Sequence, residues 1–558
     1  MKEEMKGLYL AVILSIAVIM ATNWLFPKKT VTPAPAPAVK AELKADPQAI
    51  QTGQPAAEEP VLSVAEATAN QQRIEIASPA VSGSIRVKGA RFDELYLNKY
   101  KQTLAPDSAD VELLAPSGTQ APYYAEYGWL SLDNTVKLPN ENTVWTVKGR
   151  QLTPDTPVVL EWNNGQGLKF IRKISLDNNY MFTLEQIVEN NSGKNVTLYP
   201  YGLINRKPVI EPNRSRVVHE GLTGVINSTL KEVKFSDLKD GKVEEFKSSG
   251  GWAGFSDHYW FTALILDNNQ ENNVKFAKVG DNQYQADYVG QPVMIANNTA
   301  GTFNSRFFAG AKEIKLLDNY TKQLHIDKFD LAVDFGWYYF LTKPFFYILD
   351  FLFHFIGNMG WAILLFAALL RLAMFPIANK SYESMSKMKK VQPKIQELQE
   401  RYGSDKVKLQ QEMMGLYRKE KINPASGCLP MLIQIPIFFS LYKVLNISIE
   451  IRHAPFVGWI KDLSAPDPLT ISALTHLPVP GFLDIGVWPI LMGLTMYIQQ
   501  KLNPKPANKD QARAFALMPL IFMFMLGHFA SGLVIYWTLS NILSIAQQKV
   551  IMKRVGVD

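Results

Sequence analysis

Cysteine is almost absent from this chain of 558 residues, which has only Cys428. A single cysteine excludes any intramolecular disulfide. Histidine is also scarce, and of the seven histidines His219 and His258 have no ligand-like spacing. We find neither a metal-binding motif nor a nucleophile motif, so the sequence predicts no cofactor and no enzymatic activity.

Acidic residues are the minority charge, with 51 Asp and Glu against 58 Lys and Arg. The basic residues gather beside hydrophobic segments, as the positive-inside rule describes for membrane proteins, and this argues against nucleic acid as a direct partner. The mean hydropathy of −0.05 averages two unlike regions. Residues 61–330 have the pattern of a soluble β-rich protein, whereas apolar runs dominate residues 335–555.

The N-terminal segment contains an apolar run from Leu8 to Phe26. This run is long enough to cross a hydrocarbon core of about 30 Å. A cleaved signal peptide has a shorter apolar core, so the run favours an uncleaved transmembrane anchor over residues 1–26. Residues 27–60 are rich in proline and alanine and predict a flexible linker.

Residues 61–330 contain short alternating runs separated by turns, the pattern of a large antiparallel sandwich. Runs of period two, such as 168–176 and 180–188, are bounded by Asn- and Gly-rich turns, which predict hairpins. Three such turns follow one another: 163–165, 177–179 and 189–193. We interpret the tryptophans and tyrosines of this region as core residues, with a sugar-binding site as the alternative.

The C-terminal region begins with an aromatic segment, 333–352, that includes Lys343-Pro344. Trp and Tyr favour the membrane interface, so this segment predicts an amphipathic helix along the membrane surface. A first membrane span is predicted at 356–378, and four more within 426–550. These four correspond to 427–447, 486–502, 514–529 and 531–550.

The loops of this region differ in charge. Segment 379–425 is strongly basic, whereas loop 448–485 has Arg452 and Lys461 against four acidic residues, and connection 527–532 has no Lys or Arg. The positive-inside rule then places both termini in the cytoplasm, including the short tail 551–558. The β-rich region and the acidic loop are predicted to lie outside.

The basic segment 379–425 also has a hydrophobic seam. Apolar residues recur at steps of three and four on both sides of Gly403-Ser-Asp405, which predicts an antiparallel helical hairpin. The seam consists of Met388, Val391, Ile395, Leu398, Tyr402, Leu409, Met413 and Leu416. Pro393 predicts a kink or a new helix start in the first arm. A self-packed hairpin and a mobile platform for partners or lipid headgroups both remain open.

Arg371 lies in an apolar stretch, 361–376, that should cross a membrane. An intramembrane charge costs roughly 2.5–3.5 kcal/mol on insertion scales, which makes this residue a functional-site hypothesis. The predicted helix end is on the order of 10 Å away, at 1.5 Å per residue. The side chain can therefore also snorkel toward the headgroups, and both interpretations stay open.

Several C-terminal motifs occur together: Leu370-Arg-Leu-Ala-Met-Phe-Pro376, Gly427-Cys-Leu-Pro-Met-Leu-Ile-Gln-Ile-Pro-Ile-Phe438, Ser531-Gly-Leu-Val-Ile-Tyr-Trp537 and Ser540-Asn541. In combination they resemble the family of YidC-type membrane protein insertases. The anchor and large β domain resemble the Gram-negative subgroup, whose exported domain is a β-supersandwich. The expected fold class is a multi-domain membrane protein. It combines an all-α polytopic core, made of the anchor and a five-helix insertase core, with a large all-β periplasmic domain.

The resemblance implies that the chain inserts and helps fold newly made inner-membrane proteins, alone or with the Sec translocon. In the family, a polar, positively charged groove opens to the cytoplasm and to lipid, and an intramembrane arginine, matched here by Arg371, receives polar parts of the client. The groove residues expected here are Arg371, Gln434, Gln499, Tyr536, Trp537 and Asn541. For Gln434 and Asn541, hydrogen bonding between helices is the alternative role.

The chain departs from the family at two places. Some members have a long basic tail that helps hold ribosomes, whereas Lys553-Arg-Val-Gly-Val-Asp558 is short, so we expect weak ribosome binding. Some members carry a hydroxyl one helical turn before the arginine. That position is Ala367 here, so a polar partner for Arg371 is expected from another helix. The expected location is the bacterial inner membrane, with lipid, nascent chains and Sec components as partners.

Two other functional classes fit the sequence less well. An intramembrane serine protease needs a histidine on a separate span facing Ser531, but His528 is three residues upstream and His354 precedes its span. A polytopic small-molecule transporter with a periplasmic carbohydrate-binding-like domain is the remaining alternative. The sequence lacks the repeated halves that many transporters have.

Overall fold

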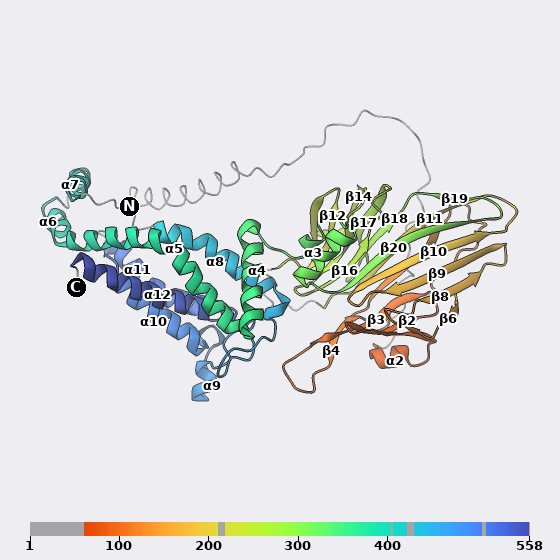
Figure 1. The fold of residues 1–558 in the computed structure, drawn as a ribbon, viewed down its shortest axis with the longest axis horizontal. Helices are drawn as coiled ribbons and strands as arrows, with labels where there is room; N and C mark the ends of the chain where they lie inside the picture. Colours follow the sequence, from red (N-terminus) through yellow and green to blue (C-terminus); the bar gives the residue numbers. More distant parts are fainter. Residues whose placement is uncertain (1–60, 210–217, 403–404, 421–428, 505–508, 557–558) are drawn as a thin grey trace, which may run out of the picture. The chain divides into compact units, whose positions relative to one another are not determined.

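The computed structural model describes residues 61–209, 218–402, 405–420, 429–504 and 509–556. The predicted anchor and linker lie outside the described residues. Within them, a large β domain is followed by a helical region, so the predicted fold class is confirmed (Figure 1). A short helix, α2 (Val64–Thr68), precedes the first strand.

The β domain consists of two large sheets packed face to face. In the first, the strand order is β14 (Val243–Ser248), β17 (Asn272–Gly280), β18 (Gln283–Val289), β11 (Val196–Arg206), β5 (Tyr123–Leu130), β3 (Arg91–Lys101), β2 (Val81–Arg86), β1 (Arg73–Ala77) and β7 (Gln151–Leu152), with β19 (Val293–Ile295) beside β11 and β4 (Asp110–Leu114) beside β3. In the second, the order is β13 (Thr229–Lys234), β12 (Gly221–Ile226), β15 (Trp252–Ser256), β16 (Trp260–Ile265), β20 (Thr299–Ala311), β10 (Met181–Asn190), β9 (Leu168–Leu176), β8 (Val158–Asn163) and β6 (Thr146–Lys148). Apart from the parallel pair β1–β7, the named strands pair antiparallel.

Two of the three predicted hairpins form. Strand β9 pairs antiparallel with both β8 and β10, and its side chains alternate between the core and the outer face. The side chain of Asn164 accepts hydrogen bonds from the backbone N–H groups of Gln166 and Leu168, and Asp177 does the same for Asn179 and Met181. The turn residues therefore close these hairpins through local side-chain hydrogen bonds.

The third predicted hairpin is wrong. Strand β10 pairs with β9 and β20 in one sheet, whereas β11 pairs with β5 and β18 in the other, so the turn after β10 crosses between sheets. The fully buried Asn190 amide donates to the carbonyl oxygens of Lys194 (2.8 Å) and Ile295 (2.9 Å). An Asn-rich turn thus also occurs where the chain crosses from one sheet to the other. The local sequence therefore does not distinguish a hairpin from a crossover.

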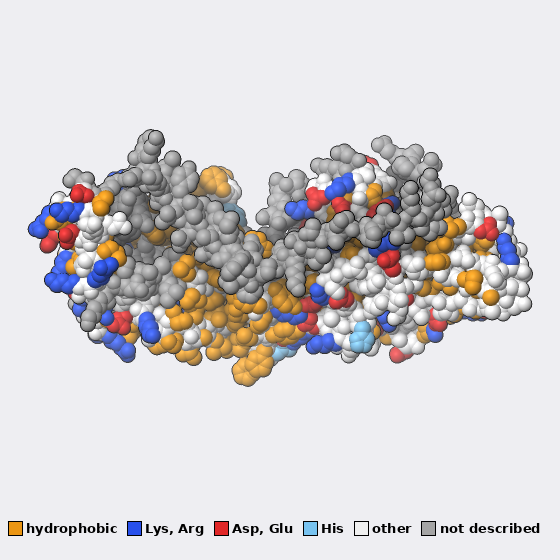
Figure 2. All heavy atoms as spheres, turned by 90° about the horizontal axis from the view of Figure 1, so that it is seen from above, with side chains coloured by type: hydrophobic (Ala, Val, Ile, Leu, Met, Phe, Trp, Pro, Cys, Tyr) orange, Lys and Arg blue, Asp and Glu red, His pale blue; other side chains and the backbone are white. Residues whose placement is uncertain are grey.

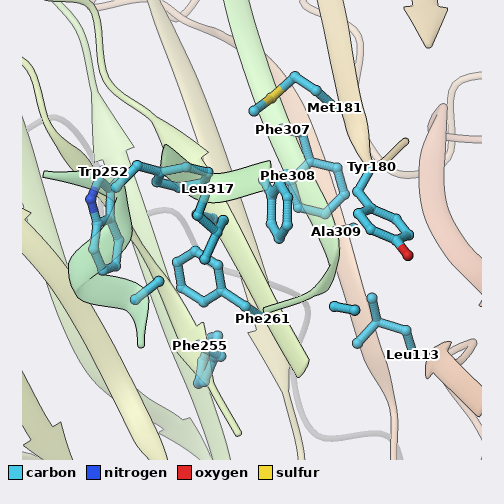
Figure 3. Close-up of a cluster of buried hydrophobic side chains, with 14 of the residues drawn as sticks. Leu113, Tyr180, Met181, Trp252, Phe255, Phe261, Phe307, Phe308, Ala309 and Leu317 are labelled. Carbon is cyan, nitrogen blue, oxygen red and sulfur yellow. The ribbon is translucent and has the colours of Figure 1, made fainter. Parts of the chain in front are cut away.

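Aromatic side chains fill the space between the sheets and beside them (Figure 3). Trp252 meets Phe261 edge to face at 5.0 Å between ring centroids, and Phe308 lies 5.6 Å from Phe261. Across the sandwich, Phe92 of β3 packs on Phe182 of β10 at 5.3 Å. Such edge-to-face pairs add about 0.5–1.5 kcal/mol each to the stabilisation from burial. The most buried aromatics therefore form the core, as the sequence suggests.

The helical region contains α3 (Ile314–Gln323), α4 (Tyr339–Ile356), α5 (Met359–Lys390), α6 (Gln392–Tyr402), α7 (Lys406–Lys419), α8 (Leu429–Ile447), α9 (Ile471–Thr475), α10 (Val487–Leu502), α11 (Lys509–Leu526) and α12 (Ser531–Val555). Among the described residues, α4 and α5 are long and apolar enough to cross a membrane, and α8 and α11 include shorter apolar helices. Figure 2 shows hydrophobic side chains gathered over much of this region on the face in view.

Helix α5 continues past the predicted end of its span, residue 378, to Lys390. It begins after Asn358, whose side chain accepts a hydrogen bond from the N–H of Trp361 (3.1 Å), and it passes through Pro376. Its second half packs on α12, where Ala378 and Tyr382 form a buried cluster with Ile551. This packing stabilises the extension beyond the apolar stretch.

Helices α6 and α7 form the predicted hairpin pair, at the end of the helical region opposite to α9 (Figure 1). Val391 is the C-cap of α5, and Pro393 is the second residue of α6, a position where proline fits a new helix. Val391 and Ile395 are buried. Met388, Met413, Leu416 and Tyr417 pack around them. The seam is narrow, as its spacing predicts.

Helix α12 lies between α5 and α10. Helix α4 packs on α5 and α8, and α11 packs on α10. This arrangement brings side chains of α5, α8, α10 and α12 together inside the helical region.

Candidate functional site

Arg371 points from α5 toward α12. One of its terminal nitrogens, Nη2, donates to the hydroxyl oxygen of Ser540 at 2.9 Å and to its carbonyl oxygen at 3.1 Å. The side chain is half-buried. The predicted partner from another helix is therefore confirmed, because Ala367 is buried on α5 and Ser540 supplies the hydroxyl. Among the described residues, no carboxylate forms a salt bridge with Arg371.

Neutral oxygens leave the charge of Arg371 uncompensated. Ser540 is 4% exposed, and its carbonyl oxygen also accepts a hydrogen bond from the Ser544 hydroxyl at 2.7 Å. A hydroxyl and a carbonyl orient a guanidinium and lower its desolvation penalty, but they do not cancel its positive charge. Within the described part of the chain the other guanidinium donors have no acceptor, so they can bind a further one.

Tyr536 lies one turn before Ser540 on α12 and is 3% exposed. Its hydroxyl oxygen accepts a hydrogen bond from the Nε2 of Gln434 on α8 at 3.1 Å. The helices α5, α8 and α12 thus meet where Tyr536 and Gln434 lie beside Ser540, the residue that binds Arg371. Gln434 has the interhelical hydrogen bond that was its alternative role.

Trp537 belongs to an aromatic wall beside this polar group. Its ring lies 4.6 Å from Phe438 of α8 and 5.6 Å from Phe522 of α11. The ring is partly buried, in a small cluster with Met492, Leu526 and Val534. Polar atoms of Arg371, Ser540 and Tyr536 thus lie near an apolar surface, an environment that suits amphipathic segments.

Asn541 and Gln499 are placed differently from Arg371. Asn541 is 4% exposed and donates to the hydroxyl oxygen of Thr495 on α10 at 3.2 Å, which is its alternative, interhelical role. Gln499 is half-buried on α10, and its side chain has no hydrogen bond to another described residue. The structure therefore does not bring Gln499 to the hydrogen-bonded group around Arg371.

Ser540 was not predicted as the contact of Arg371, although the sequence contains a periodic signal for it. Tyr536, Ser540, Ser544 and Gln548 recur at every fourth position of α12 and are all buried, at 3%, 4%, 0% and 1% exposure. We call these four residues the polar stripe. At its far end Gln548 donates to Asn503 at 3.0 Å. Polar residues at helical spacing in an apolar helix mark a face turned to protein rather than lipid.

Two family models cover almost all of the described chain. The model of the YidC periplasmic domain matches residues 73–348, and the model of the 60Kd inner membrane protein matches residues 351–557. The chain belongs to the YidC family of membrane protein insertases. Its β domain is the periplasmic domain of that family, and its helical region is the inner-membrane part.

Related insertases match over most of their length. Membrane protein insertase YidC of Beijerinckia indica subsp. indica is 46% identical, with 100% of this chain and 97% of that protein covered. The YidC of Rickettsia bellii is 48% identical, with 86% and 87% covered. A crystal structure of active YidC insertase is 17% identical with a TM-score of 0.36, covering 86% of this chain and 92% of that one. The family models and the two related insertases show that the chain is a membrane protein insertase of the inner membrane, with nascent membrane proteins as substrates.

The periplasmic domain of this YidC-family chain contains a small polar cavity. Glu126, Trp145 and Arg172 line it, and its volume is about 10 Å³. That volume holds about one water molecule, so a sugar does not fit. Burial lowers the pKa of Arg172 to about 10, and its guanidinium donates to the carbonyl oxygens of Ala90 (3.3 Å) and Tyr127 (2.5 Å). Among the described residues, no group of three or more metal-ligand side chains occurs.

Proposed function

We propose that the chain inserts newly made inner-membrane proteins along a polar, positively charged path centred on Arg371. The observation that supports this most is the pair of hydrogen bonds from Arg371 to Ser540, with no carboxylate partner among the described residues. A charge held by neutral oxygens inside an apolar bundle attracts an incoming carboxylate. It also lowers the desolvation free energy of the polar flank of a client.

The groove of this proposal uses residues of four helices. Arg371 supplies the charge, Tyr536 and Gln434 supply hydrogen-bonding groups beside it, and Trp537 offers an apolar surface for the hydrophobic part of the client. Asn541 and Gln499 are kept as peripheral groove residues on the basis of the family resemblance. A client segment then exchanges water for fixed polar groups before it reaches lipid.

The proposed topology follows the charges of the loops. Both termini and the α6–α7 hairpin lie in the cytoplasm, and the β domain lies in the periplasm, as the distribution of Lys and Arg predicts. The hairpin connects α5 to α8, the helices that carry Arg371 and Gln434. Its motion changes access to the cytoplasmic side of the groove.

One partner completes the proposal. The resemblance to the family implies that the chain inserts its clients either alone or together with the Sec translocon.

Reconstitution tests the proposal. The purified full chain is placed alone in liposomes and presented with a single-span client that has a short acidic exported tail. Protection of the tail from added protease, above that in empty liposomes, is the expected result. Equal protection with and without the chain contradicts unaided insertion, and restoration by added Sec translocon then indicates an obligatory partner.

A further inference from the structure

The loop between α8 and α10 has an uncharged end. Residues 468–483 contain no Asp, Glu, Lys or Arg, and we call them the tip. Three large apolar side chains of the tip are strongly exposed: Leu474 at 53%, Leu477 at 64% and Phe482 at 70%. Their position is fixed by local structure, since the tip contains the short helix α9 and the 3₁₀ turn Gly481–Leu483.

Two carboxylates hold the base of the tip. Asp467 accepts hydrogen bonds from the backbone N–H of Leu469 (3.0 Å) and of Trp488 (2.8 Å), and from the indole of Trp459 (2.9 Å). Asp484 accepts from the N–H and hydroxyl of Ser472 at 2.8 Å and 2.6 Å. The two carboxylates at the base of the tip thus have hydrogen-bond donors, and the apolar side chains of the tip remain exposed.

The tip lies at one end of the helical region, where several helices begin. The Nε2 of His528, in the connection between α11 and α12, is 3.0 Å from the carbonyl oxygen of Gly481. In the same loop, Phe456 packs on Trp361 at the start of α5, with 5.6 Å between ring centroids. Figure 1 shows α9 projecting from this end, near the start of α10. Trp361, Trp459 and Trp488 lie here, and tryptophan favours the membrane interface.

We propose that the tip inserts into the outer leaflet of the bilayer through Leu474, Leu477 and Phe482. This inference rests on the proposed membrane topology. A stable protein partner needs about 800 Å² of surface on each side, far more than three isolated side chains offer. A few apolar side chains on an uncharged loop beside membrane spans are instead suited to the headgroup and acyl boundary.

The insertion fixes the depth of the starts of α10 and α12. Asp467 ties the tip to the N–H of Trp488 in α10, and the backbone N–H of Ser531, the first residue of α12, donates to the carbonyl oxygen of Ala465 at 2.8 Å. Ser540 then lies at a set distance from the outer surface, because α12 is continuous from Ser531. The tip thereby sets the depth of the oxygens that hold Arg371.

Fluorescence quenching by lipids tests the inference on the full chain. Leu477→Cys and Phe482→Cys, each with Cys428→Ser, are labelled with an environment-sensitive dye in vesicles of phosphatidylethanolamine and phosphatidylglycerol. Lipids with a nitroxide near the headgroup should quench both dyes strongly, whereas aqueous iodide should quench them weakly. Met294→Cys is the matched control, because Met294 is 71% exposed on the β domain and should respond only to iodide.

The outcomes separate this inference from the proposed function. A dye at Leu369→Cys, in the middle of the apolar stretch 361–376 of α5 and 43% exposed, should be quenched by a nitroxide deep in the acyl chains. If Leu369 responds to lipid but the two tip positions respond only to iodide, the tip inference is wrong and the membrane core stands. If Leu369 also responds only to iodide, the membrane location itself fails. Crosslinking of tip cysteines between two copies, without lipid quenching, overturns the inference in favour of a self-contact.

Discussion

Arg371 on α5 and Ser540 on α12 are joined by two hydrogen bonds from a single guanidinium nitrogen, at 2.9 Å to the hydroxyl oxygen and 3.1 Å to the carbonyl oxygen. The two residues are 169 positions apart in the sequence. It orients the positive charge while leaving it unneutralised, which is the physical condition for attracting an acidic client segment.

The charge of Arg371 should be what clients recognise. Arg371→Ala should weaken insertion of clients with acidic tails about tenfold, since hydrogen bonds to charged groups contribute roughly 1.5–3 kcal/mol. Arg371→Lys should largely preserve it, because the charge remains. Protease protection of the client tail in reconstituted liposomes measures the effect.

Lys380→Ala is the matched control, since Lys380 is an exposed cation on the same helix. It should insert clients like the wild type. Equal insertion by wild type and Arg371→Ala, for acidic and neutral tails alike, would falsify the groove role and leave snorkelling as the explanation of Arg371.

Ser540 should act by positioning Arg371. Ser540→Ala removes the hydroxyl acceptor but keeps the carbonyl, so we expect a severalfold loss of insertion, smaller than that of Arg371→Ala. Ser540→Thr keeps a hydroxyl acceptor for Arg371, so this variant should insert clients like the wild type. In the Arg371→Ala background, Ser540→Ala should have little further effect, because residues in one network are not additive.

Thr538→Val serves as the control for Ser540. The Thr538 hydroxyl is buried on the same helix but donates to the carbonyl oxygen of Val534 at 2.8 Å, away from Arg371. Loss of insertion in Thr538→Val equal to that in Ser540→Ala would mean that any buried hydroxyl of α12 matters. The positioning role would then be abandoned.

The β domain should be dispensable up to the end of β20, but the segment after it should not. Lys343 of α4 donates to Asp318 of α3 at 2.8 Å and to Asp330 at 2.7 Å. Deleting residues 65–312 keeps these partners and should leave insertion substantially intact. Deleting residues 65–332 removes them, leaves a half-buried cation unpaired, and should lower both accumulation and insertion.

Membrane levels and client protection, measured together for the two deletions, provide the test. The prediction fails if the shorter deletion accumulates normally yet does not insert, because the β domain would then have a direct role. It also fails if the two deletions behave alike.

The α6–α7 hairpin should be needed as a unit. Replacing residues 392–419 with a flexible linker should abolish insertion, because the access to the groove depends on this element. Lys394→Ala should have a small effect, since the Lys394–Glu420 ion pair (2.8 Å) is exposed and such pairs contribute about 0–1 kcal/mol.

Cysteines along both arms of the hairpin, with Cys428→Ser, should crosslink to an arrested client. Wild-type insertion by the replacement, with no crosslink at any position, would make the hairpin a simple connector.

The buried Asp287 should make the β domain less stable at neutral pH. Burial raises its pKa to about 6, although Gln285 donates to it at 2.7 Å. The folded state therefore binds more protons than the unfolded state between about pH 4 and pH 6, and the free energy of unfolding falls as the pH rises through this window. Asp287→Asn should remove this loss and gain about 1–3 kcal/mol at pH 7.5, but nothing at pH 4.

Amide hydrogen exchange of β17 and β18 in the full chain measures the change. Asp281→Asn, at the exposed turn between these strands, is the control and should leave the pH profile of the wild type unchanged. If hydrogen exchange in the wild type and in Asp287→Asn depends on pH in the same way, the Asp287 carboxylate does not cause the loss of stability.

The sequence by itself determined the elements that depend on local pattern. The period of β9, the seam of Val391 and Ile395, and the apolar length of α5 all follow from side-chain spacing, which fixes which residues share a face. The sequence also indicated Arg371 as a functional-site candidate, because an isolated charge in an apolar stretch has few physical explanations. The need for a partner outside α5 followed from Ala367.

Only the tertiary structure decided which groups meet. Spacing gives a face of a helix but not the helix opposite it, so Ser540 was not recognised as the partner of Arg371. The turn after β10 crosses between sheets, and there the Asn190 amide donates to the carbonyl oxygens of Lys194 in the turn and of Ile295 at the end of β19. Long-range contacts of this kind depend on packing that is absent from any local window of sequence, and they give this insertase its polar centre.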